Sequence, residues 1–314
     1  MLHLRVVSPP DKTDEVLARL RSEPGVAHLI LHRGAALTPA GDLLEADVAR
    51  EAADEIIDVL RDFDLEHEGG ITLEAIDTAL SDAAAEAERA APGEGADAVV
   101  WQELVSRTGE ESRLNFTFQA FLTIACLLAS VGVITDSPVT IVGAMVVGPE
   151  FGPLAAIAVG LVLGRWDLVR RASVALAIGF PLAVVITGLV TLLSEAVGLI
   201  DTTALRSGGH EVDFVYDVGW YSLIVALLAG AAGMLAMTSA KSAALVGVFI
   251  SVTTVPAAGY VAVAAVTGDW ARSLESLGQL AVNLAGIVVA AAVVLAVRQR
   301  GQRGRANGRL PARE

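Results

Sequence analysis

The sequence has one cysteine and few basic residues in its first third, and each scarcity excludes a class of protein. Cys126 is the single cysteine, so an intramolecular disulfide and a Cys-x-x-Cys metal or redox motif are excluded. Residues 1–115 hold only 10 of the 22 Lys and Arg residues but 25 of the 36 Asp and Glu residues. Nucleic-acid binding needs phosphate-neutralising basic clusters, so we expect no nucleic-acid partner. Met1–Pro10 lacks a basic start followed by a long apolar core, so we expect no secretory signal there.

Apolar residues are abundant instead. They make up 54% of the 314 residues, whereas charged residues make up 18%, against about 25% in an ordinary soluble domain. Most of the acidic charge precedes residue 116. This division predicts four parts: a cytoplasmic domain over residues 1–80, a linker with an amphipathic helix over 81–115, a transmembrane domain over 116–297, and a basic cytoplasmic tail over 298–314.

The first part alternates short strand-like and helical segments. The expected strands are Leu2–Val7, Val26–His32, Leu43–Val48 and Ile71–Ile76, and the expected helices are Asp14–Arg21 and Asp54–Phe63. The order β-α-β-β-α-β predicts an α+β domain of the ferredoxin-like type. That fold serves many functions and identifies none. His28 and His32 would share one strand face, but without a neighbouring cysteine or third histidine we interpret them as an edge-strand face rather than a metal site.

The second half contains six apolar segments of the length that crosses a bilayer as a helix. They cover residues 116–134, 138–164, 172–193, 220–238, 242–267 and 279–297. Lys and Arg residues gather before the first segment and after the second, fourth and sixth, which predicts cytoplasmic N and C termini. We therefore expect an all-α, multi-pass protein of the cell (inner) membrane, with the lipid bilayer as its surroundings.

A shift of 104 residues aligns the two halves of this apolar region. It places Val142-Gly143 on Val246-Gly247, Gly164 on Gly268 and Trp166 on Trp270. The first span then lies over the fourth and the third over the sixth. Tandem units of three spans have opposite orientations in a membrane, so this pattern predicts a 3+3 inverted repeat.

Breaks near the middle of the second and fifth spans are the candidate site. Prolines remove backbone donors and glycines loosen the backbone, so the helices should be interrupted there. Interrupted helices in two inverted halves are typical of transporters with a midplane site, where freed carbonyls and helix N-termini bind the cargo. The predicted translocation or binding residues are Gly148, Pro149, Glu150, Gly152, Pro153, Thr253, Thr254 and Pro256. We expect no metal, no cofactor and no catalytic residue.

Glu150 is the charged residue within the second span. A carboxylate in the middle of a bilayer costs about 2.5–3.5 kcal/mol on insertion scales. It either takes part in a pathway or bends toward an interface and caps a half-helix. The 104-residue shift maps Glu150 onto Thr254, and we expect the two broken spans to cross near the bilayer centre with Glu150 close to Thr253, Thr254 and Pro256. A proton- or cation-coupled role follows as a hypothesis.

Residues 116–165 resemble a family of prokaryotic membrane proteins known as the uncharacterised hydrophobic domain, or domain of unknown function 389 (DUF389). The matching residues are Gly132, Asp136-Ser137-Pro138, Ile141-Val142-Gly143-Ala144-Met145, Pro149 and Gly152-Pro153. The resemblance covers about residues 100–297. Family members commonly have apolar residues where this chain has Glu150-Phe151, so the acid departs from the family pattern. The family has no settled activity, and the resemblance implies an architecture without a substrate.

Two functions remain open from the sequence. The first is a transporter or channel for a small solute or ion, with the soluble domain serving regulation or association into a homo-oligomer. The alternative is a membrane-anchored sensor or scaffold whose soluble domain binds a ligand or partner. The spans contain no HExxH motif, no pair of aspartates and no Ser/His pair, so we do not expect an enzyme.

Overall fold

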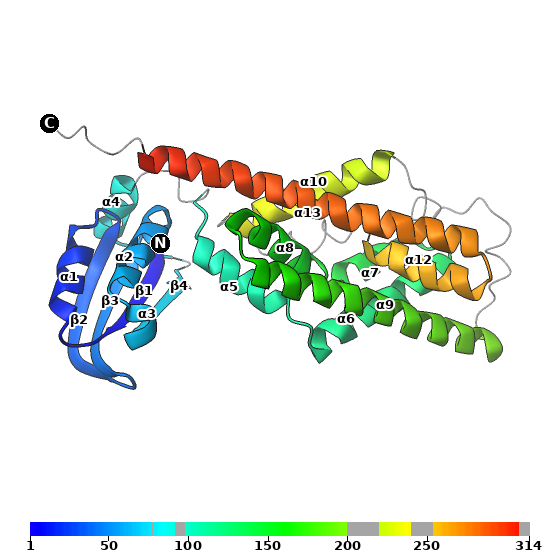
Figure 1. The fold of residues 1–314 in the computed structure, drawn as a ribbon, viewed down its shortest axis with the longest axis horizontal. Coiled ribbons are helices and arrows are strands. Elements are labelled where there is room, and N and C mark those ends of the chain that lie inside the picture. Colours follow the sequence, from blue (N-terminus) through cyan, green and yellow to red (C-terminus); the bar gives the residue numbers. More distant parts are fainter. Residues whose placement is uncertain (77, 92–97, 200–219, 240–253, 308–314) are drawn as a thin grey trace. The chain divides into compact units, whose positions relative to one another are not determined.

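The computed structural model describes residues 1–76, 78–91, 98–199, 220–239 and 254–307, which form two compact units (Figure 1). The first unit contains Met1–Leu104, and the second begins at Val105 and contains the apolar helices.

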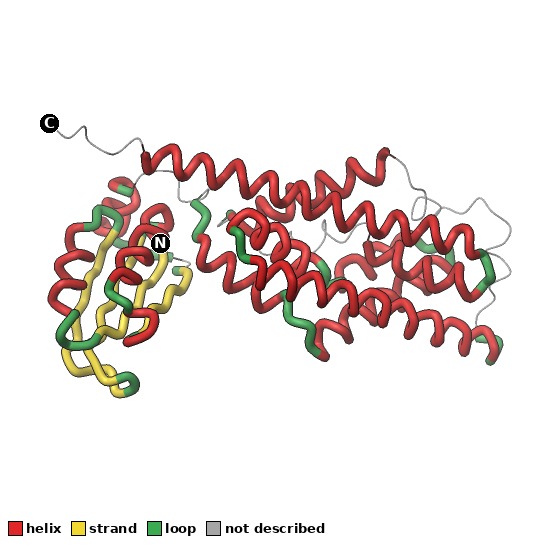
Figure 2. The backbone as a smooth tube through the Cα atoms, viewed as in Figure 1, coloured by secondary structure: helices red, strands yellow, loops and turns green. Residues whose placement is uncertain are grey.

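The first unit is built around a four-stranded antiparallel sheet (Figure 2). Its strands lie in the order β2-β3-β1-β4. Their bounds are β1 Leu2–Ser8, β2 Val26–Leu37, β3 Ala40–Val48 and β4 Gly70–Ala75. The helices of this unit are α1 Thr13–Ser22, η1 Arg50–Ala52, α2 Ala53–Asp62, α3 Leu65–Glu68 and α4 Asp82–Ala90. The main elements follow the predicted order β-α-β-β-α-β, and η1, α3 and α4 are short additions.

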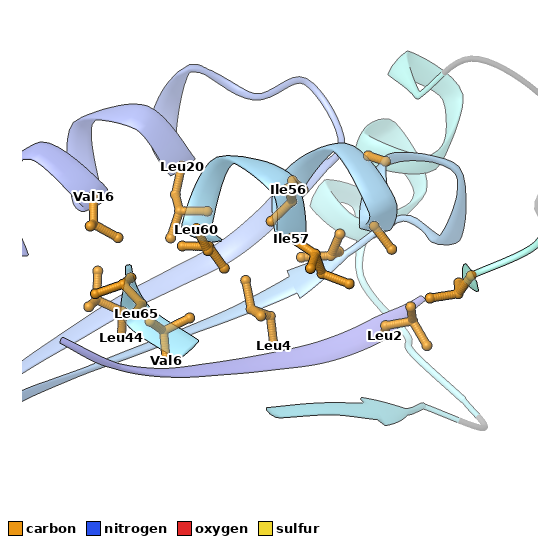
Figure 3. Close-up of a cluster of buried hydrophobic side chains, with 14 residues drawn as sticks. Leu2, Leu4, Val6, Val16, Leu20, Leu44, Ile56, Ile57, Leu60 and Leu65 are labelled. Atoms are coloured by element: carbon orange, nitrogen blue, oxygen red, sulfur yellow. The ribbon is translucent and has the colours of Figure 1, made fainter. Parts of the chain in front are cut away.

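One face of this sheet packs against α1 and α2. Alternate residues of a strand point to the same face, and Leu2, Leu4 and Val6 of β1 are all buried. Leu20 of α1 and Leu60 of α2 meet them, because residues at helical spacing share one side of a helix. Figure 3 shows these side chains between the helices and the strands. The first unit therefore has a hydrophobic core of its own.

The β2–β3 hairpin is longer than the sequence indicates. The predicted strand begins at Leu43, whereas β3 begins at Ala40 and includes Gly41, because it pairs with β2 as far as Ala40. A side chain at Gly41 would meet the backbone carbonyl of Ser8 in β1, so glycine permits the close pairing. His28 has a positive φ of 51° at an irregularity in the β2–β3 pairing. The simple alternation that would align His28 with His32 is therefore interrupted.

The second unit is helical. Its helices are α6 Phe116–Ile134, α7 Pro138–Val147, α8 Phe151–Leu163, α9 Trp166–Ala196, α10 Trp220–Thr238, α12 Thr254–Val266 and α13 Trp270–Asn307, and α5 Trp101–Glu111 leads into it. In the described part of the chain, four helices (α6, α9, α10 and α13) are long and apolar enough to cross a membrane. The α7–α8 pair, bent by 53°, would make a fifth span. The chain is thus a multi-pass membrane protein.

The observed spans agree with several of the predicted segments. Helices α6 and α10 have the predicted bounds, 116–134 and 220–238. Helices α9 and α13 extend beyond their apolar segments, because hydropathy marks the part suited to lipid and the backbone helix continues into polar sequence. The first part of the fifth predicted span lies outside the described residues, which include only α12 of that segment. Six spans therefore remain a prediction.

The two short helices α8 and α12 form much of the buried part of the bundle. Every residue of α12 from Thr254 to Ala264 is buried. Helix α12 packs against α6, α9 and α13, while α8 packs against α9 and α13. Gly259 of α12 allows the close approach to α6, since a Cβ there would lie 2.7 Å from the Cβ of Ala129. The long helices expose apolar side chains on their outer faces, as lipid contact requires.

Candidate functional site

The helix predicted over residues 138–164 is broken at the expected position, between α7 and α8. Helix α7 ends at Val147, Gly148 follows it as the C-cap, and α8 begins at Phe151. Pro149 has no backbone N–H and cannot continue the hydrogen bonding of α7. Pro153 lies in the first turn of α8, where a missing N–H is tolerated. The sequence therefore stops one helix and starts another within three residues, and Glu150 is the N-cap of the second.

The Glu150 side chain is fully buried, with an exposed fraction of 0%. Its Oε1 accepts a hydrogen bond of 2.6 Å from the Oγ1 hydroxyl of Thr254. Its other oxygen, Oε2, is buried and has no hydrogen-bond partner among the described residues. A hydroxyl is weak compensation for a buried carboxylate, which normally needs a cation or several donors. Burial with so little compensation is unusual enough to mark the position as a candidate site.

Glycine at position 148 makes room for this carboxylate. A Cβ on residue 148 would collide with Oε2 of Glu150 and would lie 2.8 Å from Cγ2 of Val255. The glycine of the break thus serves two purposes, because it ends α7 and it admits the acid. Val255, beside Thr254 in α12, is a neighbour of the site that the sequence did not indicate.

Thr254 is the first residue of α12 and is itself fully buried. The 104-residue shift predicted that Glu150 and Thr254 lie close together, and the hydrogen bond confirms this contact. Pro256 follows in the same helix and is buried. Thr253 lies outside the described residues. The break of the second span and the start of α12 therefore meet at one point.

Gly152 has a different role from the one its motif indicates. A Cβ there would lie 2.6 Å from the Cβ and 3.3 Å from the backbone oxygen of Glu111, so this glycine admits α5 against α8. Thr108 of α5 and Ser112, which directly follows α5, are fully buried, and Arg171 of α9 donates to the Gly109 carbonyl at 3.0 Å. Thr108 and Ser112 are small residues four positions apart, a spacing that indicates close helix packing and could have been used to predict this contact. Pro153 is buried within α8.

Polar side chains also connect α10 and α13. Ser222 of α10 donates to Oδ1 of Asn283 at 3.0 Å, and Nε2 of Gln279 donates to the Ser222 hydroxyl at 3.1 Å. Gln279 and Asn283 both belong to the last span. They bond across helices, which ties the two long helices together.

The histidines of the first unit contact acids rather than forming a metal centre. Nδ1 of His28 lies 2.6 Å from Oδ2 of Asp47, and its Nε2 lies 2.7 Å from the Ser81 hydroxyl oxygen. His3 lies 3.0 Å through Nδ1 from Oδ1 of the same Asp47. Nε2 of His32 lies 3.7 Å from Oε2 of Glu45. In the described ranges no group of three His, Cys, Asp or Glu side chains is placed to hold a metal ion.

Comparisons with known proteins agree with the helical part of this description. The family model described as "Domain of unknown function (DUF389)" matches residues 145–289, a shorter range than the 100–297 that the motifs indicate. The uncharacterized protein MJ0678 of Methanocaldococcus jannaschii is 22% identical over 205 residues, which are 61% of this chain and 58% of that protein. The chain thus spans a little over half the length of this curated relative. No solved structure matches the chain. The family match includes both Glu150 and Thr254, and it confirms the resemblance of the membrane half to the DUF389 family.

Proposed function

We propose that this protein is a transporter or channel for a small solute or ion, with its site where the α7–α8 break meets the start of α12. The observation that carries the proposal is Glu150, fully buried, held by one hydroxyl and otherwise without a hydrogen-bond partner among the described residues. A purely structural bundle gains nothing from such a group, since an apolar residue of similar volume would be equally or more stable there. Intramembrane acids usually mark ion or substrate pathways.

The proposal includes the 3+3 inverted repeat. The helix bounds support it, because α6 and α10 begin and end 104 residues apart, and so do the starts of α9 and α13. Gly164 and Gly268, also related by this shift, follow α8 and α12 in the same left-handed conformation, with φ of 71° and 81°. Matching helix ends with matching backbone geometry are more specific than the alignment of apolar letters.

The helix contacts support the same symmetry. Helix α8 packs on α13 and α9 packs on α12, which is the exchange that a two-fold axis between two units produces. Glu150 and Thr254 are 104 residues apart and touch each other. A residue that contacts its own equivalent lies on the axis, so the proposed site coincides with the symmetry axis of the bundle. Rocking of one half against the other would then open the site to each side in turn.

The proposed orientation has cytoplasmic termini and a cell-membrane location, and it rests on the distribution of Lys and Arg between the loops. Labelling of single cysteines introduced near Ser207 and Gln302 tests it, with the first expected outside and the second inside. Labelling of both from one side contradicts this topology.

Flux through purified protein in liposomes, screened over ions and small anions, tests the function itself. Gly148→Ala should abolish the flux because its methyl group takes the space of the Glu150 carboxylate. Gly143→Ala is the matched control in α7, since a Cβ there meets nothing within 4 Å. Flux that survives Gly148→Ala contradicts the proposed site. A protein that moves no solute at all favours the sensor or scaffold.

A further inference from the structure

We infer that the occupant which Glu150 binds and releases is a proton, so that transport by this protein is coupled to proton movement. The inference rests on the proposed function and names the coupling ion at the same site. It follows from the surroundings of the two carboxyl oxygens.

The space around Glu150 fits a proton better than a metal cation. Oε2 is inaccessible and lies beside Gly148, because a Cβ on that glycine would collide with it. The same Cβ would lie 2.8 Å from Cγ2 of Val255, so an aliphatic group also lines this space. A hard metal cation needs several oxygen ligands at about 2.0–2.6 Å, and aliphatic groups offer none. The described residues contain no cluster of three His, Cys, Asp or Glu side chains suited to a metal. A proton needs only the oxygen that carries it.

Thr254 can serve both protonation states. Its hydroxyl donates to Oε1 in the observed arrangement, at 2.6 Å, and the same hydroxyl has lone pairs that accept from a carboxylic acid O–H. A turn of one hydroxyl rotor and one carboxyl group therefore adapts the hydrogen bond to either state. The α8–α12 contact can persist while the proton arrives and leaves.

The electrostatics couple proton binding to closure of the site. Lys and Arg side chains make no ion pair with Glu150 in the described ranges, and the buried thiol of Cys126 in α6 is near enough to interact with it electrostatically. Helix α12 contributes the uncharged Thr254 and Val255. The ionised acid thus has one hydroxyl and no cation among the described residues to compensate its charge, so it needs water, whereas the neutral acid can be enclosed. The proton comes from water on one side, forms one O–H bond on Glu150, and returns to water on the other side when that bond breaks.

Proton movement can be measured beside solute movement in liposomes that hold a pH-sensitive dye, with full-length protein. Solute gradients should change the internal pH with the unaltered chain, and Glu150→Gln, which keeps the acceptor for Thr254, should lose this change completely. Glu275→Gln is the matched control, because Glu275 is an exposed carboxylate of α13. It should retain the pH change. Solute flux without a pH change, or a pH change that persists in Glu150→Gln, overturns the inference.

Infrared difference spectroscopy separates this inference from the proposed function. The unaltered chain should show a carboxylic-acid carbonyl band that is lost at alkaline pH and is absent from Glu150→Gln at every pH. Glu275→Gln should keep the band. If no solute moves but the band behaves in this way, the proposed transport fails while Glu150 remains a proton-binding group. If the band is missing from the unaltered chain, the inference fails, whatever the flux measurements give.

Discussion

The two compact units treat a buried carboxylate in opposite ways. Asp42 of β3, in the first unit, accepts a hydrogen bond of 2.7 Å from the backbone N–H of Gly34 and has the Arg33 guanidinium 3.6 Å from Oδ2. The Gly34 N–H is the main reason that the pKa of Asp42 lies below its usual value, and Arg33 adds to it. Glu150 of the second unit accepts a single hydrogen bond among the described residues, from the Thr254 hydroxyl. One oxygen of each acid, Oδ2 of Asp42 and Oε2 of Glu150, is buried without a hydrogen-bond partner among the described residues. The difference is that Asp42 has a guanidinium nearby, whereas no ion pair of Glu150 is seen in the described ranges.

Apolar replacement of the two acids should give the largest difference in stability between the units. Asp42→Leu removes the partner of Gly34 and Arg33 and should destabilise the first unit. Glu150→Met removes a poorly compensated acid and should leave the second unit unchanged or stabilise it by up to about 4 kcal/mol. Hydrogen exchange of the full chain, read separately for β3 and α8, measures both effects. Opening of α8 in Glu150→Met would show that the acid holds the fold together.

The pH dependence of the first unit should be dominated by Asp54 of α2. Burial raises its pKa to about 6, partly offset by the Trp101 N–H that it accepts at 3.1 Å. The folded state then binds this proton more tightly than the unfolded state, whose value is 3.8. The free energy of unfolding should therefore fall as pH rises from about 4 to about 6, by at most about 3 kcal/mol.

Asp42 should act in the reverse direction and in another window, because its folded pKa is lowered. Its contribution is present above 3.8 and is lost as pH falls below that value through its folded pKa. Thermal unfolding of the full chain across pH measures both slopes. Asp54→Asn should remove the slope between pH 4 and 6, whereas Asp62→Asn, at an exposed position of α2, should keep it. An unchanged slope in Asp54→Asn contradicts this assignment.

Removal of the Thr254 hydroxyl, which donates to Glu150, should give the smallest effect of the three predicted changes in stability. Thr254→Val leaves the carboxyl without its hydrogen bond and should destabilise the second unit by roughly 2 kcal/mol. Thr187→Val in α9 is the control, because the Thr187 hydroxyl is buried and has no hydrogen-bond partner among the described residues. It should be neutral or slightly stabilising. Equal losses in both variants would mean that the Glu150 contact has no special weight.

Much of this molecule was predictable where one physical requirement dominates the sequence. The length of an apolar run is set by the thickness of the bilayer, and α6 and α10 have the bounds predicted from it. The contact of Glu150 with Thr254 was predictable because a 104-residue shift relates two similar segments. The break before α8 followed from Pro149, which has no N–H to donate.

Other features depend on contacts that a linear sequence does not display. Gly152 reads as a helix breaker beside Pro153, but its space is filled by Glu111 from a helix that precedes the first span. Gly148 likewise reads as a loosened backbone, yet it accommodates the Glu150 carboxylate. Gly41 reads as a turn, although β3 continues through it because of its approach to Ser8. In each case the sequence shows that the residue is a glycine, but it does not show which group packs against that glycine.

The distance of 104 residues between Glu150 and Thr254 also orders the events of biosynthesis. A ribosome that adds about 5–20 residues per second needs roughly 5–20 s to pass from one to the other. Helix α8 therefore reaches the membrane with its acid before the hydroxyl partner has been made. The first apolar helices enter the bilayer as an incomplete assembly, and the arrival of α12 completes it. A chain truncated before α12 would lack the hydroxyl that Glu150 accepts from in the complete chain.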